Sequence, residues 1–144
     1  MRRNLAIIAV AAAFAVTAHA DDRPMDFSRL PSSAREFVKA NFPDDKVIYV
    51  LKDDDLVRPD YTVMLSNGVR IDFEHSGALE KIESADGGIP SAIIPVQIID
   101  YLKHHYPDAV ILGYEIGRRS YEVKLSNRLE LKFSNRFNLT EIDD

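Results

Sequence analysis

The sequence contains no cysteine among its 144 residues. The chain therefore cannot form the disulfides that hold many small secreted domains together, and it offers no cysteine for lipid attachment. It also lacks the Gly-x-Ser-x-Gly turn of serine hydrolases and the glycine-rich loops that bind phosphate groups. Because these patterns for nucleophilic catalysis and nucleotide binding are missing, we expect a protein that is not an enzyme and that carries no cofactor.

Basic residues are fewer than acidic ones, at 18 Lys and Arg against 23 Asp and Glu, which leaves a formal charge of −5. This balance argues against nucleic acid and anionic membrane surfaces as partners, since both attract basic patches. Residues 1–20 combine two early arginines, a short apolar run and Ala18-His19-Ala20, the pattern of a secretory signal peptide. The run is too short to span a bilayer comfortably, so a membrane anchor is the lesser alternative. We expect a periplasmic or secreted protein that starts at Asp21, without membrane insertion after signal cleavage.

A hairpin pattern occurs twice. Residues 61–73, YTVMLSNGVRIDF, return as residues 121–133, YEVKLSNRLELKF. Apolar and polar residues alternate in both stretches, which is typical of half-buried strands. A three-residue loop, 66–68, pairs apolar residues with one another across the hairpin, whereas a two-residue Asn-Gly turn pairs them with charged residues. We therefore predict the three-residue loop, with Gly68 at positive φ and Arg128 at the same place in the second hairpin.

Each copy of the pattern follows a predicted helix. The dipeptides Leu30-Pro31 and Ile94-Pro95 mark the helix starts, and Pro43 and Pro107 follow the helix ends. Ser33, with the glutamate three residues after it, forms a possible capping box and offers a slightly later start for the first helix. Apolar residues at helical spacing give each helix one apolar stripe, which is suited to packing on a sheet.

The predicted fold class is α+β, built as a tandem repeat. Each repeat is a helix followed by a four-stranded antiparallel sheet, with the helix packed on one sheet face. We expect a signal peptide at 1–20 and one compact domain at 21–144, made of a first repeat at 27–86 and a second at 90–144. Because about sixty residues bury too little surface to be stable alone, the two repeats should share a core or a continuous sheet.

Candidate metal ligands are weak. His104 and His105 are adjacent, so on a helix they diverge by about 100° and cannot easily hold one metal ion. The acidic runs at 44–45 and 53–55 offer oxygen ligands for calcium but lack the spacing of a calcium-binding loop. Solvated turns are the main interpretation of these runs, calcium binding is the alternative, and we assign no metal ligands.

The polar face of the second hairpin carries complementary charges. In the predicted register, Glu122 lies opposite Lys132 and Lys124 lies opposite Glu130. Opposite charges at paired positions support the register and are typical of a solvated sheet face.

The same face of the first hairpin is different. Met64 lies opposite Arg70 there, and we expect Val47, Tyr49 and Leu51 to point outward from the neighbouring strand. An exposed apolar and aromatic patch usually indicates a partner. The alternative is that the other repeat or the N-terminal arm covers this face. We predict Tyr49, Met64 and Arg70 as partner-binding residues, and no catalytic residues.

The chain resembles the PepSY-like proteins, secreted bacterial proteins that are also described as β-lactamase-inhibitor-like. The resemblance rests on the proline-marked helix ends and on the first hairpin with its following glycine: Leu30-Pro31, Ile94-Pro95, Phe42-Pro43, Tyr106-Pro107, Tyr61 to Phe73, and Gly77. It implies tandem helix-plus-four-strand repeats, a periplasmic or secreted location, and a binding or inhibitory role. The resemblance does not assign a functional role to any individual residue of this chain.

Together these patterns predict a non-catalytic binding module that is secreted or periplasmic. Its expected role is that of an inhibitor or sensor of another envelope protein, whose identity the sequence leaves open. The alternative is an envelope protein that binds a small ligand or calcium in the groove between the repeats. Saturable stabilisation by calcium would distinguish the second function from the first.

Overall fold

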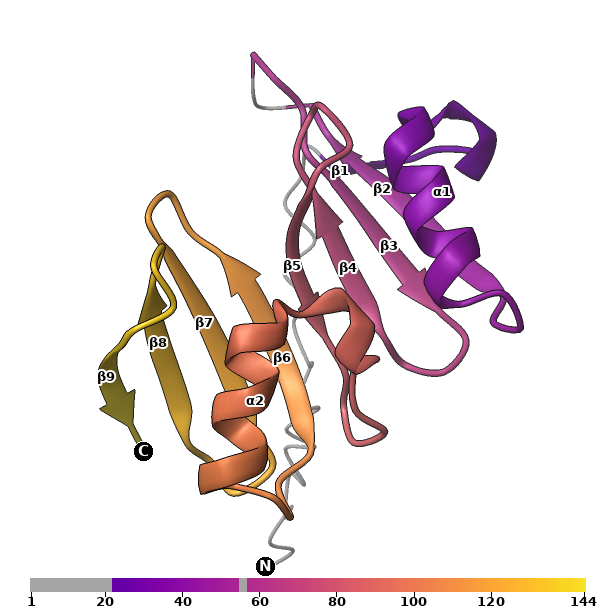
Figure 1. Ribbon diagram of the computed structural model, residues 1–144. Coiled ribbons are helices and arrows are strands. Elements are labelled where there is room, and N and C mark those ends of the chain that lie inside the picture. The colour runs from indigo at the N-terminus through magenta and orange to yellow at the C-terminus, as the bar shows by residue number, and fades with distance from the viewer. Residues whose placement is uncertain (1–21, 55–56) are drawn as a thin grey trace, which may run out of the picture.

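The computed structural model describes residues 22–54 and 57–144. The predicted signal peptide, at 1–20, lies outside the described residues. Within them, nine strands form one antiparallel sheet in chain order, and two α-helices lie on the same side of it (Figure 1). Strands β1 to β9 span Asp22–Pro24, Val47–Asp53, Tyr61–Leu65, Arg70–Phe73, Leu79–Glu83, Ile111–Ile116, Ser120–Leu125, Glu130–Ser134 and Leu139–Asp143. The helices are η1 (Phe27–Arg29), α1 (Ser32–Asn41), η2 (Ser91–Ile93) and α2 (Val96–His105).

The predicted fold class is wrong. We expected a tandem repeat of a helix with its own four-stranded sheet, whereas the structure is mostly one nine-stranded sheet with two helices in its described part. The sheet is continuous because β5 pairs with β6, where Ile82 lies opposite Tyr114. The Ser84 N–H extends this ladder by donating to the Leu112 carbonyl at 2.8 Å. Without this pairing β5 would present a row of unpaired backbone groups at a sheet edge.

The first strand was also missed. β1 covers only Asp22–Pro24 and pairs antiparallel with β2. A three-residue strand is too short to show an alternating pattern, so its pairing depends on contacts far away in the sequence.

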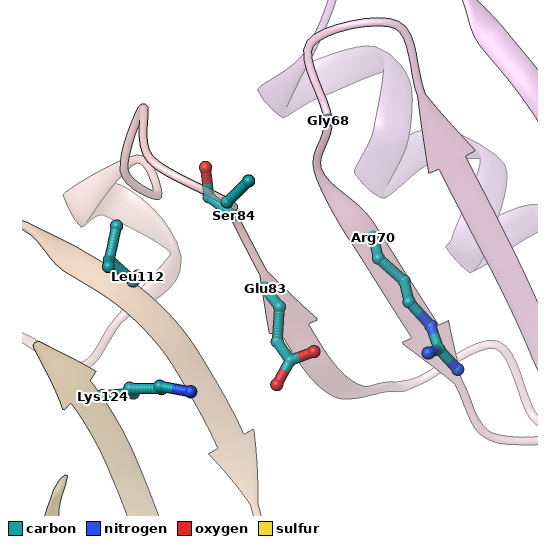
Figure 2. Close-up of a pocket in the computed structure, with 7 residues that line it drawn as sticks. Gly68, Arg70, Glu83, Ser84, Leu112 and Lys124 are labelled. Carbon is teal, nitrogen blue, oxygen red and sulfur yellow. The ribbon is translucent and has the colours of Figure 1, made fainter. Parts of the chain in front are cut away.

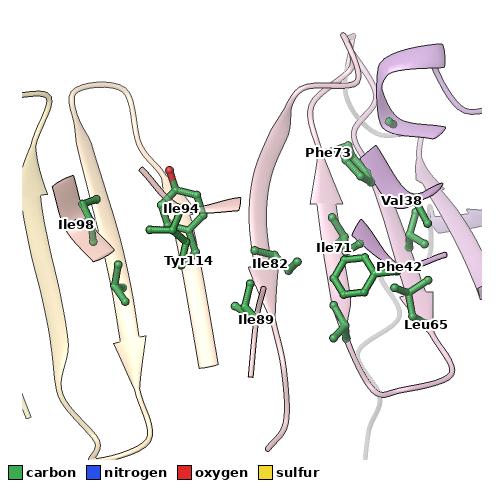
Figure 3. Packing of buried hydrophobic residues seen from close by; sticks show 14 of the residues in the cluster. Val38, Phe42, Leu65, Ile71, Phe73, Ile82, Ile89, Ile94, Ile98 and Tyr114 are labelled. Atoms are coloured by element: carbon green, nitrogen blue, oxygen red, sulfur yellow. The ribbon is translucent and has the colours of Figure 1, made fainter. Parts of the chain in front are cut away.

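The core lies between the helices and the sheet. One cross-strand row on the helix side is buried in every strand from β2 to β8: Val50, Val63, Ile71, Ile82, Tyr114, Val123 and Leu131. Figure 3 labels three of them, Ile71, Ile82 and Tyr114. From the helices, Ala34 and Ile98 are each fully buried, at 0% exposure. All of these residues belong to one hydrophobic cluster that runs across the β5–β6 junction. Full burial of one such aliphatic side chain stabilises the fold by roughly 1.5 to 3 kcal/mol.

The hairpin registers are as predicted. Tyr61 lies opposite Phe73 in the first hairpin, and Glu122 lies opposite Lys132 in the second. The Leu65 N–H donates to the Val69 carbonyl at 2.9 Å, which closes the three-residue loop. This pairing keeps the apolar side chains of both strands on the helix side of the sheet.

The helix ends also follow the prolines. Pro31 is the N-cap of α1, and the helix ends one residue before its C-cap, Phe42. The possible capping box does not form, because α1 starts at Ser32 with Pro31 as its N-cap and no side chain caps it. The Ser33 hydroxyl instead donates to the Ser76 carbonyl at 3.2 Å. This contact brings the start of α1 against Gly77, where an added Cβ would lie 2.8 Å from the Cβ of Pro31.

Candidate functional site

One face of the sheet is the strongest candidate for a functional surface. We call the face opposite α1 and α2 the open face, since none of the described helices covers it (Figure 1). Two cross-strand rows form its centre. One row runs through Leu51, Thr62, Asp72, Lys81, Glu115, Glu122, Lys132 and Glu141. The other runs through Tyr49, Met64, Arg70, Glu83, Gly113, Lys124, Glu130 and Asp143.

The three predicted partner-binding residues are neighbours on this face. Tyr49 lies opposite Met64 across β2 and β3, and Met64 lies opposite Arg70 across β3 and β4. Tyr49 is 40% exposed, the Arg70 side chain is 51% exposed, and Met64 is half-buried. The structure therefore joins an aromatic ring, a thioether and a guanidinium in one continuous strip.

One residue of the predicted outward set is on the other face. Val47 lies opposite Leu65 and packs against the core, while Tyr49 lies opposite Met64, so the register shifts between them. The extra residue is Ile48, which is 60% exposed. A β-bulge inserts one residue into a strand and interrupts the period of two, so simple alternation placed Val47 on the wrong side. Ile48 is an exposed apolar residue next to Tyr49 that the sequence reasoning missed.

A hollow of about 390 Å³ lies on the open face where β5 meets β6, and we call it the central hollow (Figure 2). Its lining consists of Gly68, Arg70, Glu83, Ser84, Ala85, Leu112 and Lys124. Gly113 contributes no side chain to the row between Glu83 and Lys124, and an added Cβ would lie 3.0 Å from the Cβ of Lys124. A side chain at Gly113 would therefore press on Lys124, which lines the central hollow.

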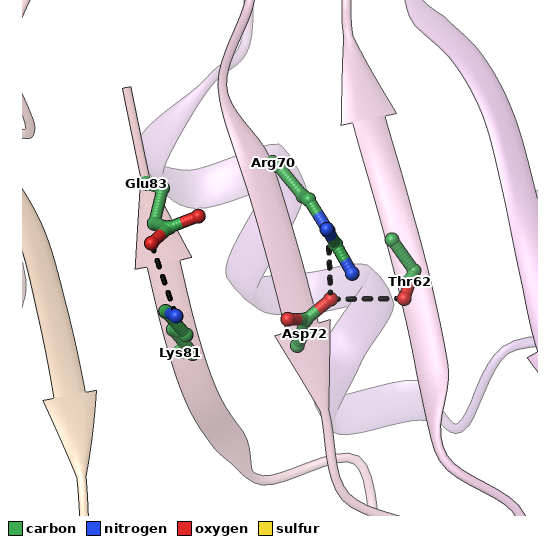
Figure 4. Close-up of polar contacts among 5 residues, drawn as sticks. All are labelled: Thr62, Arg70, Asp72, Lys81 and Glu83. Carbon is green, nitrogen blue, oxygen red and sulfur yellow. Dashed lines mark hydrogen bonds and ion pairs between the residues drawn. The ribbon is translucent and has the colours of Figure 1, made fainter. Parts of the chain in front are cut away.

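Two cations on the open face pair along their own strands (Figure 4). The Arg70 Nε lies 3.3 Å from Asp72 Oδ1, and the Lys81 Nζ lies 3.0 Å from Glu83 Oε1. The Thr62 hydroxyl also donates to Asp72 Oδ1 at 2.9 Å. Hydrogen bonding to Glu83 raises the pKa of Lys81, against the opposing effect of burial. These charges are therefore already compensated within the face.

A second hollow, of about 250 Å³, lies toward the N-terminal edge of the open face. We call it the first acidic hollow, because its lining includes Asp53, Asp60, Asp72, Glu80 and Glu115. Burial, and then the charge of Asp53, raises the pKa of Asp60. Burial, and then the charges of Asp60 and Asp72, raises the pKa of Glu80. Negative charge is crowded here.

A third hollow, of about 200 Å³, continues across β6 to β8 and is called the second acidic hollow. It is lined by Lys81, Glu83, Gly113, Tyr114, Glu115, Glu122, Lys124 and Glu130. Burial, and then the charges of Glu130 and Glu115, raises the pKa of Glu122, while Lys132 lowers it. The register alone predicted Glu122 as a partner of Lys132, but the two nearby carboxylates affect the pKa of Glu122 more than Lys132 does.

His104 and His105 lie at the end of α2, apart from this face, whereas His75 is close enough to Asp60 to lower the pKa of that carboxyl. The His105 ring stacks on the Tyr101 ring at 4.2 Å between centroids, and His104 Nδ1 lies 2.7 Å from the Asp100 carbonyl oxygen. His105 is exposed. In the part of the chain that the structure describes, no three His, Asp or Glu side chains are grouped closely enough to hold a metal ion.

Solved structures with this fold come from periplasmic proteins of Bacteroides. A "putative calcium-regulated periplasmic protein" of Bacteroides thetaiotaomicron is 40% identical, with a TM-score of 0.83, covering 86% of this chain and 98% of that one. A periplasmic protein of Bacteroides vulgatus from the DUF2874 family is 36% identical, with a TM-score of 0.83, covering 88% and 99%. Another from Bacteroides vulgatus is 30% identical, with a TM-score of 0.80, covering 85% and 99%. No curated protein matches the chain.

These likenesses place the chain in the class of periplasmic proteins. None of the helices in the described residues has the length and apolar character needed to cross a membrane. The family model described as "Putative beta-lactamase-inhibitor-like, PepSY-like" matches residues 59–141, more than half of the sequence. The chain belongs to the PepSY-like family.

Proposed function

We propose that this protein is a non-catalytic binding module of the periplasm, and that it acts as an inhibitor or sensor of another envelope protein through its open face. The observation that carries the proposal is the strip of Tyr49, Met64 and Arg70, which lie side by side on the face of the sheet that none of the described helices covers. Ile48 adds an exposed apolar side chain beside it.

The chemistry of this strip is suited to a protein interface. Tyr, Met and Arg are enriched in interfaces, and Tyr and Arg often contribute most to binding energy. A Met side chain adapts to irregular surfaces because it is unbranched and polarisable. Arg70 stays hydrogen-bonded to Asp72 in the free protein, so its guanidinium is oriented before a partner arrives. The family description, which refers to an inhibitor of β-lactamase, also supports a binding role.

The proposal is tested by capturing envelope proteins on the wild-type chain and identifying what is retained. Affinity for the purified partner is then compared between wild type and Tyr49→Ala with Met64→Ala. We expect each substitution to weaken binding by about 1 kcal/mol without changing the melting temperature. Val96→Ala, at a 64% exposed apolar residue on α2, is the matched control and should bind like wild type. Unchanged affinity, or a large loss of stability, would refute the assignment of the strip.

Calcium regulation is the second candidate function. The similar protein from Bacteroides thetaiotaomicron is described as calcium-regulated, and the first acidic hollow places Asp60 and Glu80 near further carboxylates. A calcium ion bound there would require these side chains to rotate toward one another, since no three metal-binding side chains are grouped among the described residues. Calcium should then raise the melting temperature saturably, with magnesium much weaker and Glu80→Gln abolishing the effect. An unchanged melting temperature would exclude this function.

A further inference from the structure

Acidic side chains are concentrated on the open face. Its carboxylates are Asp22, Asp53, Asp60, Asp72, Glu80, Glu83, Glu115, Glu122, Glu130, Glu141 and Asp143. Its cations are Arg70, Lys81, Lys124 and Lys132. The helices, by contrast, expose both signs, with Glu36 and Lys39 on α1 and Asp100 and Lys103 on α2. The excess negative charge of the protein is therefore concentrated on the open face.

The cations on the open face leave part of this charge uncompensated. Arg70 and Lys81 are each paired with a carboxylate on their own strand. Among the described residues, neither Glu80 nor Glu122 lies within ion-pair distance of a Lys or Arg. The raised pKa of each of these two carboxyls reflects burial first and neighbouring negative charge next. A cationic ligand would relieve that repulsion.

The acidic region is too long for one small ion to neutralise. The two acidic hollows share Lys81 and Glu115 in their linings, so they adjoin across the β5–β6 junction. Because neighbouring strands lie about 4.8 Å apart, the region from β3 to β8 extends about 24 Å. A divalent cation holds oxygen ligands at about 2.5 Å and would neutralise only one hollow. An extended peptide rises about 3.3 Å per residue, so about seven residues span both hollows.

We propose that the open face binds a lysine- and arginine-rich segment of a partner protein, which lies across β3 to β8 with cationic side chains in both acidic hollows. This inference rests on the proposed function and names the chemistry of the partner. A second copy of the chain is a poor occupant, because two acidic faces repel each other. Uncharged or acidic segments would leave the carboxylates of the hollows desolvated without compensation.

The experiment measures binding of an oligolysine peptide of about twelve residues, long enough to span both hollows. Oligoglutamate and a Gly-Ser peptide of equal length are the ligand controls. Oligolysine should bind, and the affinity should fall as salt rises from low to physiological concentration. Glu80→Gln with Glu122→Gln should weaken binding about tenfold, because one charge is lost in each hollow. The matched variant Glu36→Gln with Asp100→Asn loses the same charge from the helices and should remain within about twofold of wild type.

Absence of oligolysine binding, or equal weakening in both double variants, would overturn the inference. Saturable displacement of the peptide by calcium at low millimolar concentration would also overturn it, in favour of an ion site. Failure of the proposed function is distinguished with the captured envelope partner. If that partner binds Glu80→Gln with Glu122→Gln as tightly as wild type, the function stands and the basic segment is wrong. If oligolysine binding is lost in that variant yet no envelope protein is captured, the two acidic hollows do bind cationic segments and the proposed function is wrong.

Discussion

Gly68 and Arg128 share a left-handed backbone conformation, with φ of 85° and 73°, at the last position of the loops that join β3 to β4 and β7 to β8. In each loop an asparagine accepts a backbone hydrogen bond at 3.0 Å from the residue two positions later, from Val69 N–H to Asn67 and from Leu129 N–H to Asn127. Glycine adopts this conformation without steric cost, whereas a residue with a Cβ does so at roughly 1 kcal/mol.

The two loops should therefore respond in opposite directions to substitution. Gly68→Ala should lower the free energy of unfolding by about 1 kcal/mol, and Arg128→Gly should raise it by a few tenths of a kcal/mol. Urea denaturation of the two variants measures both effects. If both substitutions are neutral, backbone strain at these positions does not contribute to stability.

Gly77→Ala should be more damaging than Gly68→Ala. Both glycines have positive φ, at 87° and 85°. A Cβ at Gly68 would meet none of the described atoms within 4 Å, whereas a Cβ at Gly77 would overlap the Ser33 hydroxyl and press on Pro31. We expect a loss of about 2 kcal/mol or more at Gly77, because α1 must shift away from the sheet. Equal losses in urea denaturation would show that only the backbone conformation matters.

Tyr114 should make stability depend on alkaline pH. Burial, and then Tyr121, raises the pKa of Tyr114 to about 12, while an unfolded tyrosine has a pKa of about 10. Folding therefore favours the neutral form of Tyr114. Its contribution to the free energy of unfolding is complete below pH 10 and is lost between about pH 10 and 12. The free energy of unfolding of wild type should decline over this interval, and Tyr114→Phe should make that decline smaller by roughly 2 kcal/mol.

The measurement is the free energy of unfolding against pH for both proteins. Tyr49→Phe is the control, because Tyr49 is 40% exposed on the open face and Tyr114 is 3% exposed. The control should follow the wild-type curve. A Tyr114→Phe curve parallel to wild type up to pH 12 would contradict the prediction.

Glu122→Gln should stabilise the protein at neutral pH. The pKa of Glu122 is raised by burial and then by Glu130 and Glu115, so its ionisation opposes folding as pH rises through the folded-state pKa. Because this carboxyl is only partly buried, the gain at neutral pH should be about 0.5 kcal/mol or less, and it should vanish on acidification below about pH 4.

Lys132→Gln provides the opposite test. Lys132 lies across from Glu122 and lowers its pKa, so removing this cation should reduce stability at neutral pH. Thermal denaturation at pH 7 and in acid measures both variants. If Glu122→Gln is less stable than wild type at pH 7, attraction to Lys132 exceeds the repulsion from the neighbouring carboxylates.

Several features of the molecule were determined by the sequence alone. Alternation in 61–73 was enough to establish the first hairpin register, and the same pattern holds in 121–133. Prolines were enough to locate the helix ends. These features are local, because each depends on steric limits or pairing within a few residues. The adjacency of Met64 and Arg70 followed for the same reason.

Only the tertiary structure decided how the strands join and where charge collects. Ile82 and Tyr114 are separated by η2 and α2 in sequence, and their pairing satisfies backbone groups that no local pattern identifies as neighbours. The bulge at Ile48 moved Val47 to the core side, since one extra residue reverses the alternation that precedes it. The first acidic hollow likewise combines Asp60, Glu80 and Glu115, which the sheet brings together although the chain keeps them far apart. Electrostatic crowding depends on distance in space, so the sequence could show the excess of acid but not the face on which it gathers.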